Sequence, residues 1–232
     1  MSLKLKWIFT LTILFFSVAE AATYTLPSGT LPNSCASDGS NTVICSSLIL
    51  NWNDKINVTA SGAVTLNING DAYFSNVKIN VGGDHNNLTI NIDGKLTSNT
   101  QEVVVANIYA IGPITTSDNS NYTGNLNSEN SITSSTGTKI TGDIFSPSAI
   151  IGGKNTLNGN VNATNITIQA SNSVVNGYLS ASNSIDLGSH ASITGNISAG
   201  GHITTTSPVT LAGDISAGGD FNLASGSTVL GN

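Results

Sequence analysis

Residues 193–199 read Ile-Thr-Gly-Asn-Ile-Ser-Ala, and residues 213–217 repeat the end of this motif as Gly-Asp-Ile-Ser-Ala, eighteen residues after Gly195. The motif is a glycine followed by Asn or Asp, an aliphatic residue, any residue and Ala or Ser. Its glycines are Gly124, Gly142, Gly159, Gly177, Gly195 and Gly213, separated by 18, 17, 18, 18 and 18 residues. A fixed short period predicts one structural unit stacked on copies of itself.

Each unit has the same internal pattern of apolar residues. They recur two, eight and sixteen residues after the glycine: Leu126, Ile144, Val161, Leu179, Ile197 and Ile215; Ile132, Ile150, Ile185, Ile203 and Phe221; Ile140, Val175, Ile193, Leu211 and Val229. Apolar and polar residues alternate within each group, which is the period of a strand. We therefore expect the apolar residues to point into the core, with Ile197 between Leu179 and Ile215. The pattern predicts an all-β fold, a three-sided single-stranded β-solenoid (β-helix) with about 18 residues per turn.

The glycines are expected at a corner of the coil, where a positive φ or a close backbone approach excludes a side chain. Asn or Asp follows most of them, as in Asn125, Asp143, Asn160 and Asp214. These side chains hydrogen-bond readily to nearby backbone, so we expect a structural ladder of Asn and Asp along this corner.

Similar motifs continue upstream with longer steps, since Val64–Gly70 resembles Leu88–Gly94 twenty-four residues later. We therefore expect larger, irregular turns toward the N-terminus, and a polar loop at Ser117–Tyr122 where the period changes. The expected organisation is a signal peptide at residues 1–21, a disulfide-stapled cap at 22–50, irregular solenoid turns at 51–120 and regular turns at 121–232.

The first residues have the features of an export signal. Lys4 and Lys6 precede the mostly apolar stretch 7–18, and Ala19-Glu20-Ala21 is an A-x-A cleavage site. The apolar stretch is shorter than the ~20 residues that a membrane span needs, although an uncut signal anchor remains the alternative. The sequence predicts an exported chain, located in the periplasm, at the outer surface or outside the cell, without a membrane span after signal removal.

The two cysteines, Cys35 and Cys45, lie close together in a chain expected to be exported. Such a pair most simply forms a disulfide. A redox or metal-binding pair is the alternative, but no histidine lies near them in the sequence.

The charged residues restrict the possible partners. Residues 22–232 contain five Lys, no Arg and twelve acidic residues, so their formal charge is −7. A chain with so few cations has little means to hold phosphates, which argues against nucleic acid and anionic lipid as partners.

The sequence predicts no catalytic residues, no cofactor and no metal site. His85, His190 and His202 fall at different places in the repeat, and Asp143 and Asp214 share their position with asparagines. An enzyme of the polysaccharide-cleaving β-helix type would need clustered carboxylates. Ice binding would need aligned Thr-x-Thr pairs, and the pairs here, such as Thr204/Thr206, fall at unmatched positions.

The repeat of residues 121–232 resembles that of bactofilins, polymer-forming proteins that fold as a three-sided β-helix and join end to end. The whole chain is similar to the N-terminal region of MshQ-like proteins of the MSHA type IV pilus system, which begin with a signal peptide, a Leu-Pro-containing segment and a cysteine pair. Here these are Leu26-Pro27, Leu31-Pro32, Cys35 and Cys45. The resemblance implies a structural protein of the bacterial cell surface, in pilus biogenesis or adhesion.

Two other roles remain open, a bactofilin-like polymer-forming scaffold and an adhesin module that binds surface glycans. Gly231-Asn232 begins a further unit, so the strands before it are expected to form an open solenoid end with Phe221, Val229 and Leu230 near the opening. Open strand edges pair with other strands, which predicts protein partners or self-association at this end.

Overall fold

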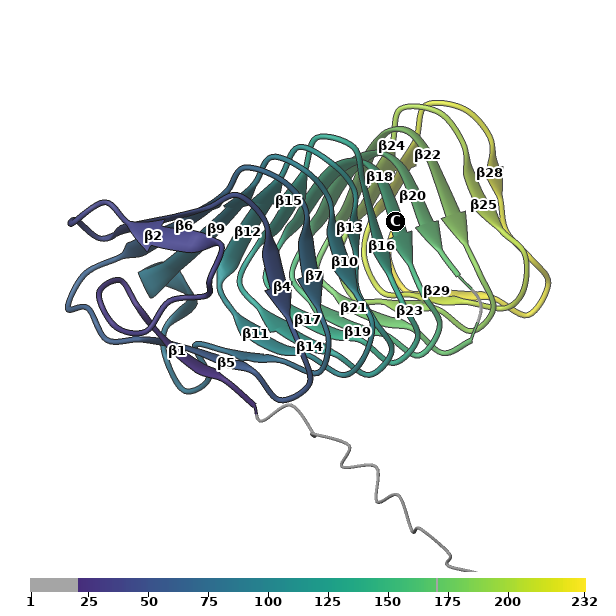
Figure 1. The fold of residues 1–232 in the computed structure, drawn as a ribbon. Coiled ribbons are helices and arrows are strands. Elements are labelled where there is room, and N and C mark those ends of the chain that lie inside the picture. Colours follow the sequence, from purple (N-terminus) through teal and green to yellow (C-terminus); the bar gives the residue numbers. More distant parts are fainter. Residues whose placement is uncertain (1–20, 170) are drawn as a thin grey trace, which may run out of the picture.

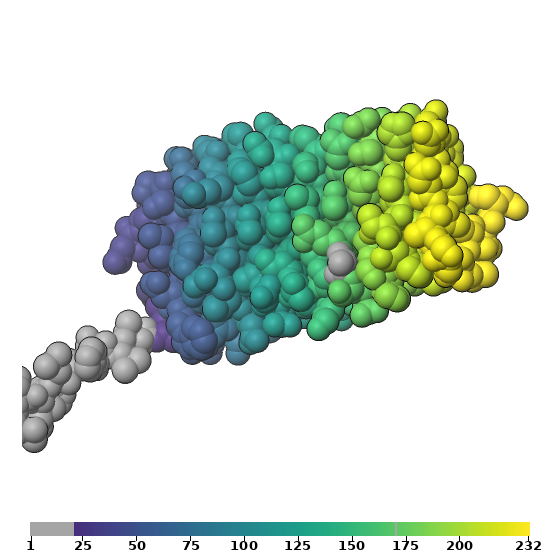
Figure 2. Space-filling view, turned by 90° about the vertical axis from the view of Figure 1, so that its right-hand side faces the viewer, coloured from purple at the N-terminus to yellow at the C-terminus, as the bar shows by residue number. Residues whose placement is uncertain are grey.

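The structure is a computed structural model that describes residues 21–169 and 171–232. The signal peptide expected at residues 1–21 therefore lies, apart from Ala21, outside the described residues. The described chain is a three-sided β-solenoid whose turns follow one another in sequence order (Figure 1). A side view shows the same order as successive bands of colour along the molecule (Figure 2).

The strands stack in three columns, one for each side of the coil. The first column contains β1 (Thr23–Leu26), β5 (Lys55–Val58), β8 (Lys78–Ile79), β11 (Val103–Val105), β14 (Asn121–Thr123), β17 (Lys139–Thr141), β19 (Thr156–Asn158), β21 (Val174–Asn176), β23 (Ser192–Ile193), β26 (Thr210–Leu211) and β29 (Thr228–Val229).

The second column contains β3 (Thr42–Cys45), β6 (Val64–Ile68), β9 (Leu88–Ile92), β12 (Asn107–Ala110), β15 (Leu126–Ser128), β18 (Ile144–Ile151), β20 (Val161–Ile168), β22 (Leu179–Leu187), β24 (Ile197–Ala199) and β27 (Ile215–Ala217). The third contains β4 (Leu48–Leu50), β7 (Ala72–Phe74), β10 (Leu96–Ser98), β13 (Ile114–Thr115), β16 (Ser131–Ser134), the second halves of β18, β20 and β22, β25 (Ile203–Thr205) and β28 (Phe221–Asn222). A short 3-10 helix, η1 (His85–Asn87), interrupts one of the longer turns.

Within each column, neighbouring strands are parallel and the apolar positions lie directly above one another. Ile197 pairs with Leu179 on one side and with Ile215 on the other, as the repeat predicts. Ile197 is 1 % exposed, so its side chain lies in the core inside the coil. The larger N-terminal turns are also confirmed, because Leu66 pairs with Ile90, twenty-four residues later, whereas Ile90 already pairs with Ile108 after eighteen.

One expected core position is wrong. Ile150 pairs with the outward Thr133, and Ala149 takes the buried place beside Ile132. The cause is the single seventeen-residue step. In the preceding turn, two residues separate Ser128 from Ser131. In β18, Pro147 alone separates the two halves of the strand. The missing residue moves every later position of that strand by one place, and in a strand this exchanges the inward and outward sides.

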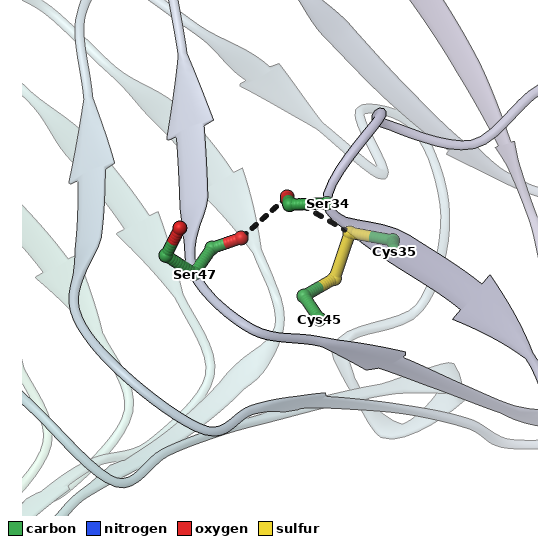
Figure 3. Close-up of a disulfide and its surroundings, with 4 residues drawn as sticks. All are labelled: Ser34, Cys35, Cys45 and Ser47. Carbon is green, nitrogen blue, oxygen red and sulfur yellow. Dashed lines mark hydrogen bonds between the residues drawn. A yellow bond between two sulfur atoms is a disulfide. The ribbon is translucent and has the colours of Figure 1, made fainter.

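A hairpin and a disulfide close the first turn of the second column. β2 (Cys35–Ser37) pairs antiparallel with β3, and Cys35 lies opposite Cys45. The expected disulfide joins these two residues, and the Ser34 hydroxyl beside it donates a hydrogen bond to the Ser47 carbonyl (Figure 3). Leu26 and Cys45 are fully buried at this end of the core.

The last described turn exposes apolar side chains. Phe221 is 39 % exposed, Leu223 40 % and Leu230 70 %, whereas Ile203 and Leu211 in the preceding turn are fully buried. Self-association of a polypeptide of residues 22–232 through this turn, measurable by analytical ultracentrifugation, stays a prediction.

The stacked register leads to a test at Ile197. We expect Ile197→Asp to place an unpaired carboxylate in the core and to lower the free energy of unfolding by several kcal/mol. Asn196→Asp is the matched control, because Asn196 is exposed and Asp occupies the same corner position at 143 and 214. Urea unfolding followed by circular dichroism measures both, and equal stability of the two variants would contradict the assigned core side.

Candidate functional site

The six corner glycines stack in one line where the chain enters the second column. A Cβ atom on any of them would lie 2.5 or 2.6 Å from the carbonyl carbon one turn before, which is too close for a real contact. Gly124 and Gly142 also have positive φ values of 120° and 142°. Close backbone approach is therefore the requirement that all six positions share.

The Asn and Asp residues after these glycines form the expected ladder. In each case the side-chain oxygen accepts a hydrogen bond from the backbone N–H one turn later, at 2.8–3.1 Å. The acceptors are Asn125, Asp143, Asn160, Asn196 and Asp214, together with Asn107, which follows Ala106 in the turn before Gly124. Asp143 and Asp214 thus have a structural role at the corner, which accounts for their shared position.

A buried polar cluster lies at one corner of the irregular region. Glu102 is 1 % exposed, and both Ser117 and Ser120 donate their hydroxyls to its Oε2 atom. The Thr100 backbone N–H donates to Oε1 at 3.2 Å. The expected polar loop at Ser117–Tyr122 is therefore only partly a solvent loop, since these two serines turn inward to satisfy a buried carboxylate.

Tyr122 lies beside this cluster and is also fully buried. Its hydroxyl lies 2.9 Å from the Ser98 hydroxyl, within hydrogen-bond distance. Burial, reinforced by the Glu102 carboxylate, raises the pKa of the Tyr122 phenol far above its usual range. A phenol that stays protonated inside the core serves packing and not acid–base chemistry.

The histidines lie on different turns and face different partners. His85 lies 3.5 Å from Asp84, and the His202 Nδ1 atom accepts a hydrogen bond from the Asp220 backbone N–H. His190 is exposed beside Ser189. Among residues 21–169 and 171–232, no group of three or more His, Cys, Asp or Glu side chains is arranged to hold a metal ion.

The outer side of the second column carries aromatic and amide side chains in alternation. We call this set the Asn–aromatic row; its members, in order along the stack, are Asn67, Asn91, Tyr109, Asn127, Phe145 and Asn162. Tyr178 lies beside the row, at the corner just before β22, and its hydroxyl accepts a hydrogen bond from the Asn162 amide at 3.3 Å. Tyr109, Phe145 and Tyr178 are 44, 36 and 41 % exposed.

A shallow hollow of about 190 Å³ lies against Tyr109. Asn91 and Asn127 flank it along the row, and the carboxylates of Asp93 and Glu129 line it at the adjoining corner. The hollow thus combines an aromatic ring with hydrogen-bonding amide and carboxylate groups.

The outer side of the third column carries a row of mostly threonine side chains that the sequence analysis missed. Its members are Thr97, Thr115, Thr133, Ile150, Thr167, Asp186 and Thr204. The search for Thr-x-Thr pairs could not find a row with one threonine per turn. Listing the residue nine positions after each glycine would have found Thr133 and Thr204, but not Thr167, which lies eight positions after Gly159.

The Asn–aromatic row was missed for a different reason. Its two aromatic members in register, Tyr109 and Phe145, are two turns apart, so an eighteen-residue alignment places Tyr109 against Asn127 and hides the spacing. A comparison at twice the period would have aligned Tyr109 with Phe145.

No helix in the described part of the chain is long and apolar enough to cross a membrane. Comparison with protein-family models, curated proteins and solved structures found no match to this chain. The similarity to bactofilins and MshQ-like proteins therefore remains a hypothesis drawn from the motifs themselves.

The glycine line leads to a second stability test. We expect Gly195→Ala to force the backbones of two turns apart and to cost about 1–3 kcal/mol, the usual effect of overpacking. Ser198→Ala is the control, because Ser198 is an exposed residue three positions away on β24. Thermal unfolding of both variants provides the comparison, and a Gly195→Ala protein as stable as the control would show that the corner has room for a side chain.

Proposed function

We propose that the chain is an exported structural β-solenoid of the bacterial cell surface, MshQ-like, acting in type IV (MSHA) pilus biogenesis or in adhesion. Its role would be passive, as a rigid element that spaces or displays other components. The observation that carries this proposal is the continuous stack: backbone hydrogen bonds and one apolar core connect every described turn to the next. Such a stack would resist bending, because bending must stretch the backbone hydrogen bonds between successive turns on one side of the coil.

The surface chemistry supports a structural role over catalysis. The carboxylates of Asp143 and Asp214 accept hydrogen bonds from backbone N–H groups one turn later, and the buried Glu102 carboxylate accepts from serine hydroxyls. Each carboxylate therefore has a hydrogen-bond partner within the protein, so its position needs no substrate to explain it.

Two features support export. The first is the Cys35–Cys45 disulfide, since disulfides persist mainly in oxidising compartments. The second is the environment of Ala22, the residue after the A-x-A motif. Its backbone nitrogen donates to the Asp54 carboxylate at 2.7 Å, and Asp54 is only 5 % exposed. Cleavage after Ala21 would convert this amide into an α-ammonium group already in contact with a carboxylate.

Processing at this bond gives a direct test of export. We expect the exported protein to begin at Ala22, as measured by intact mass. In a polypeptide starting at Ala22, Asp54→Asn should lower thermal stability more than in one with extra residues before Ala22, because only the free amino group forms an ion pair. Export without cleavage at this bond, or equal effects of Asp54→Asn in the two polypeptides, would contradict it.

The cellular role is tested by removing whole turns. Loss of the chain from its bacterium should reduce piliation or adhesion. Deleting residues 196–213 joins Gly195 to Asp214 and recreates the repeat, so a shortened but intact rod should restore the phenotype. Deleting only residues 196–204 breaks the register and should not restore it. Electron microscopy and adhesion counts provide the readout, and unchanged piliation and adhesion without the chain would reject the proposal.

A further inference from the structure

We propose that the Asn–aromatic row binds an extended, neutral, β-linked polysaccharide that lies along the solenoid axis. This inference rests on the proposed surface role for its biological setting, but its test uses purified protein. It concerns Tyr109, Phe145 and Tyr178 as stacking platforms and the asparagines between them as hydrogen-bonding groups.

The three rings are available for stacking. Each is more than one-third exposed, whereas their strand neighbours Ile108, Ile144 and Leu179 are fully buried. Exposed aromatic faces offer apolar area at low conformational cost and keep a polar edge for water. The flat C–H faces of β-linked pyranose rings are the natural complement to such platforms.

The spacing suits a repeating ligand. Tyr109 and Phe145 are two turns apart in register, a separation of about 9.6 Å at the usual strand spacing. An extended β-1,4-linked polysaccharide repeats its orientation every second sugar on a comparable length. Alternate sugars could therefore stack on Tyr109 and Phe145 without bending the chain or the protein. Tyr178 lies two residues before Ser180, the next position of this spacing, so it offers a third ring beside the line of the first two.

The groups between the rings match the hydroxyls of a sugar. Asn127 lies between Tyr109 and Phe145, and each Asn amide offers both donors and an acceptor. Asn162 donates to the Tyr178 hydroxyl and thereby holds that ring beside the row. The hollow at Tyr109 adds one further asparagine, Asn91, on the side of the ring opposite Asn127.

Charge selects a neutral ligand over an acidic one. The row contains no lysine among its described members, and the hollow is lined by the carboxylates of Asp93 and Glu129. An anionic polysaccharide would meet repulsion there, whereas carboxylates accept hydrogen bonds from neutral sugar hydroxyls.

The test is titration of the polypeptide of residues 22–232 with cellohexaose and chitohexaose, using an oligogalacturonate as the anionic probe, by calorimetry. We expect binding of at least one neutral hexamer, a loss of about two- to tenfold in affinity for each ring replaced by alanine, and weaker binding of the anionic probe. Tyr178→Phe keeps the ring but removes its bond to Asn162, so it should lose less than Tyr178→Ala. Tyr73→Ala, which removes an aromatic ring from the third column, is the matched control and should bind normally.

The variants change outward side chains, and circular dichroism checks that each remains folded. No binding of either neutral hexamer, equal binding by the Tyr109→Ala/Phe145→Ala/Tyr178→Ala protein, or preference for oligogalacturonate would overturn the inference. A strain that loses adhesion without the chain while the protein binds no glycan would leave the structural proposal standing and reject only this one. Glycan binding together with unchanged piliation and adhesion would support this inference and reject only the structural proposal.

Discussion

The parallel hydrogen bonding between successive turns is the constraint on which the other features depend. It fixes each residue directly above its counterpart at about 4.8 Å, so whatever occupies one position meets the same kind of neighbour in the next turn. Aliphatic residues become a continuous core, and glycines become a line of close backbone approach. The Asn and Asp oxygens accept the backbone N–H one turn later because the spacing brings it within reach.

An antiparallel strand, and not another parallel one, covers the beginning of the second column. β2 runs antiparallel to β3, so the outer edge of β3 is occupied by a hairpin partner and not by another parallel turn. The Cys35–Cys45 bond pins this hairpin at its open end, where Cys45 is part of the core. An antiparallel cap and a cross-link together satisfy an edge that would otherwise invite a further strand.

The sequence predicted the repeating core and corner positions and the disulfide, and it missed features of the outer surface and of the irregular turns. The glycine spacing was sufficient for the three-sided coil and for the inward place of Ile197, because core positions must recur in every turn. Ile150 failed because register follows the hydrogen bonds and not the count from the last glycine. Glu102 gave no signal, since it lies in an irregular turn where its serine partners come from a later corner. Tyr109 and Phe145 are two turns apart in register, so a one-turn alignment obscures their relation.

The separation between inward and outward positions explains how such a fold acquires function. Outward residues such as Tyr109 and Thr115 contribute little to the core, so they can change without loss of the stack. Their distances along the axis are nevertheless fixed in multiples of one turn. A ligand that repeats along its length can therefore fit the protein when its repeat equals the distance between the turns that carry a ring. Its binding energy then grows with the number of turns that it contacts. Long polymers are the ligands that gain most from this geometry, because a single-site ligand can use only one turn of it.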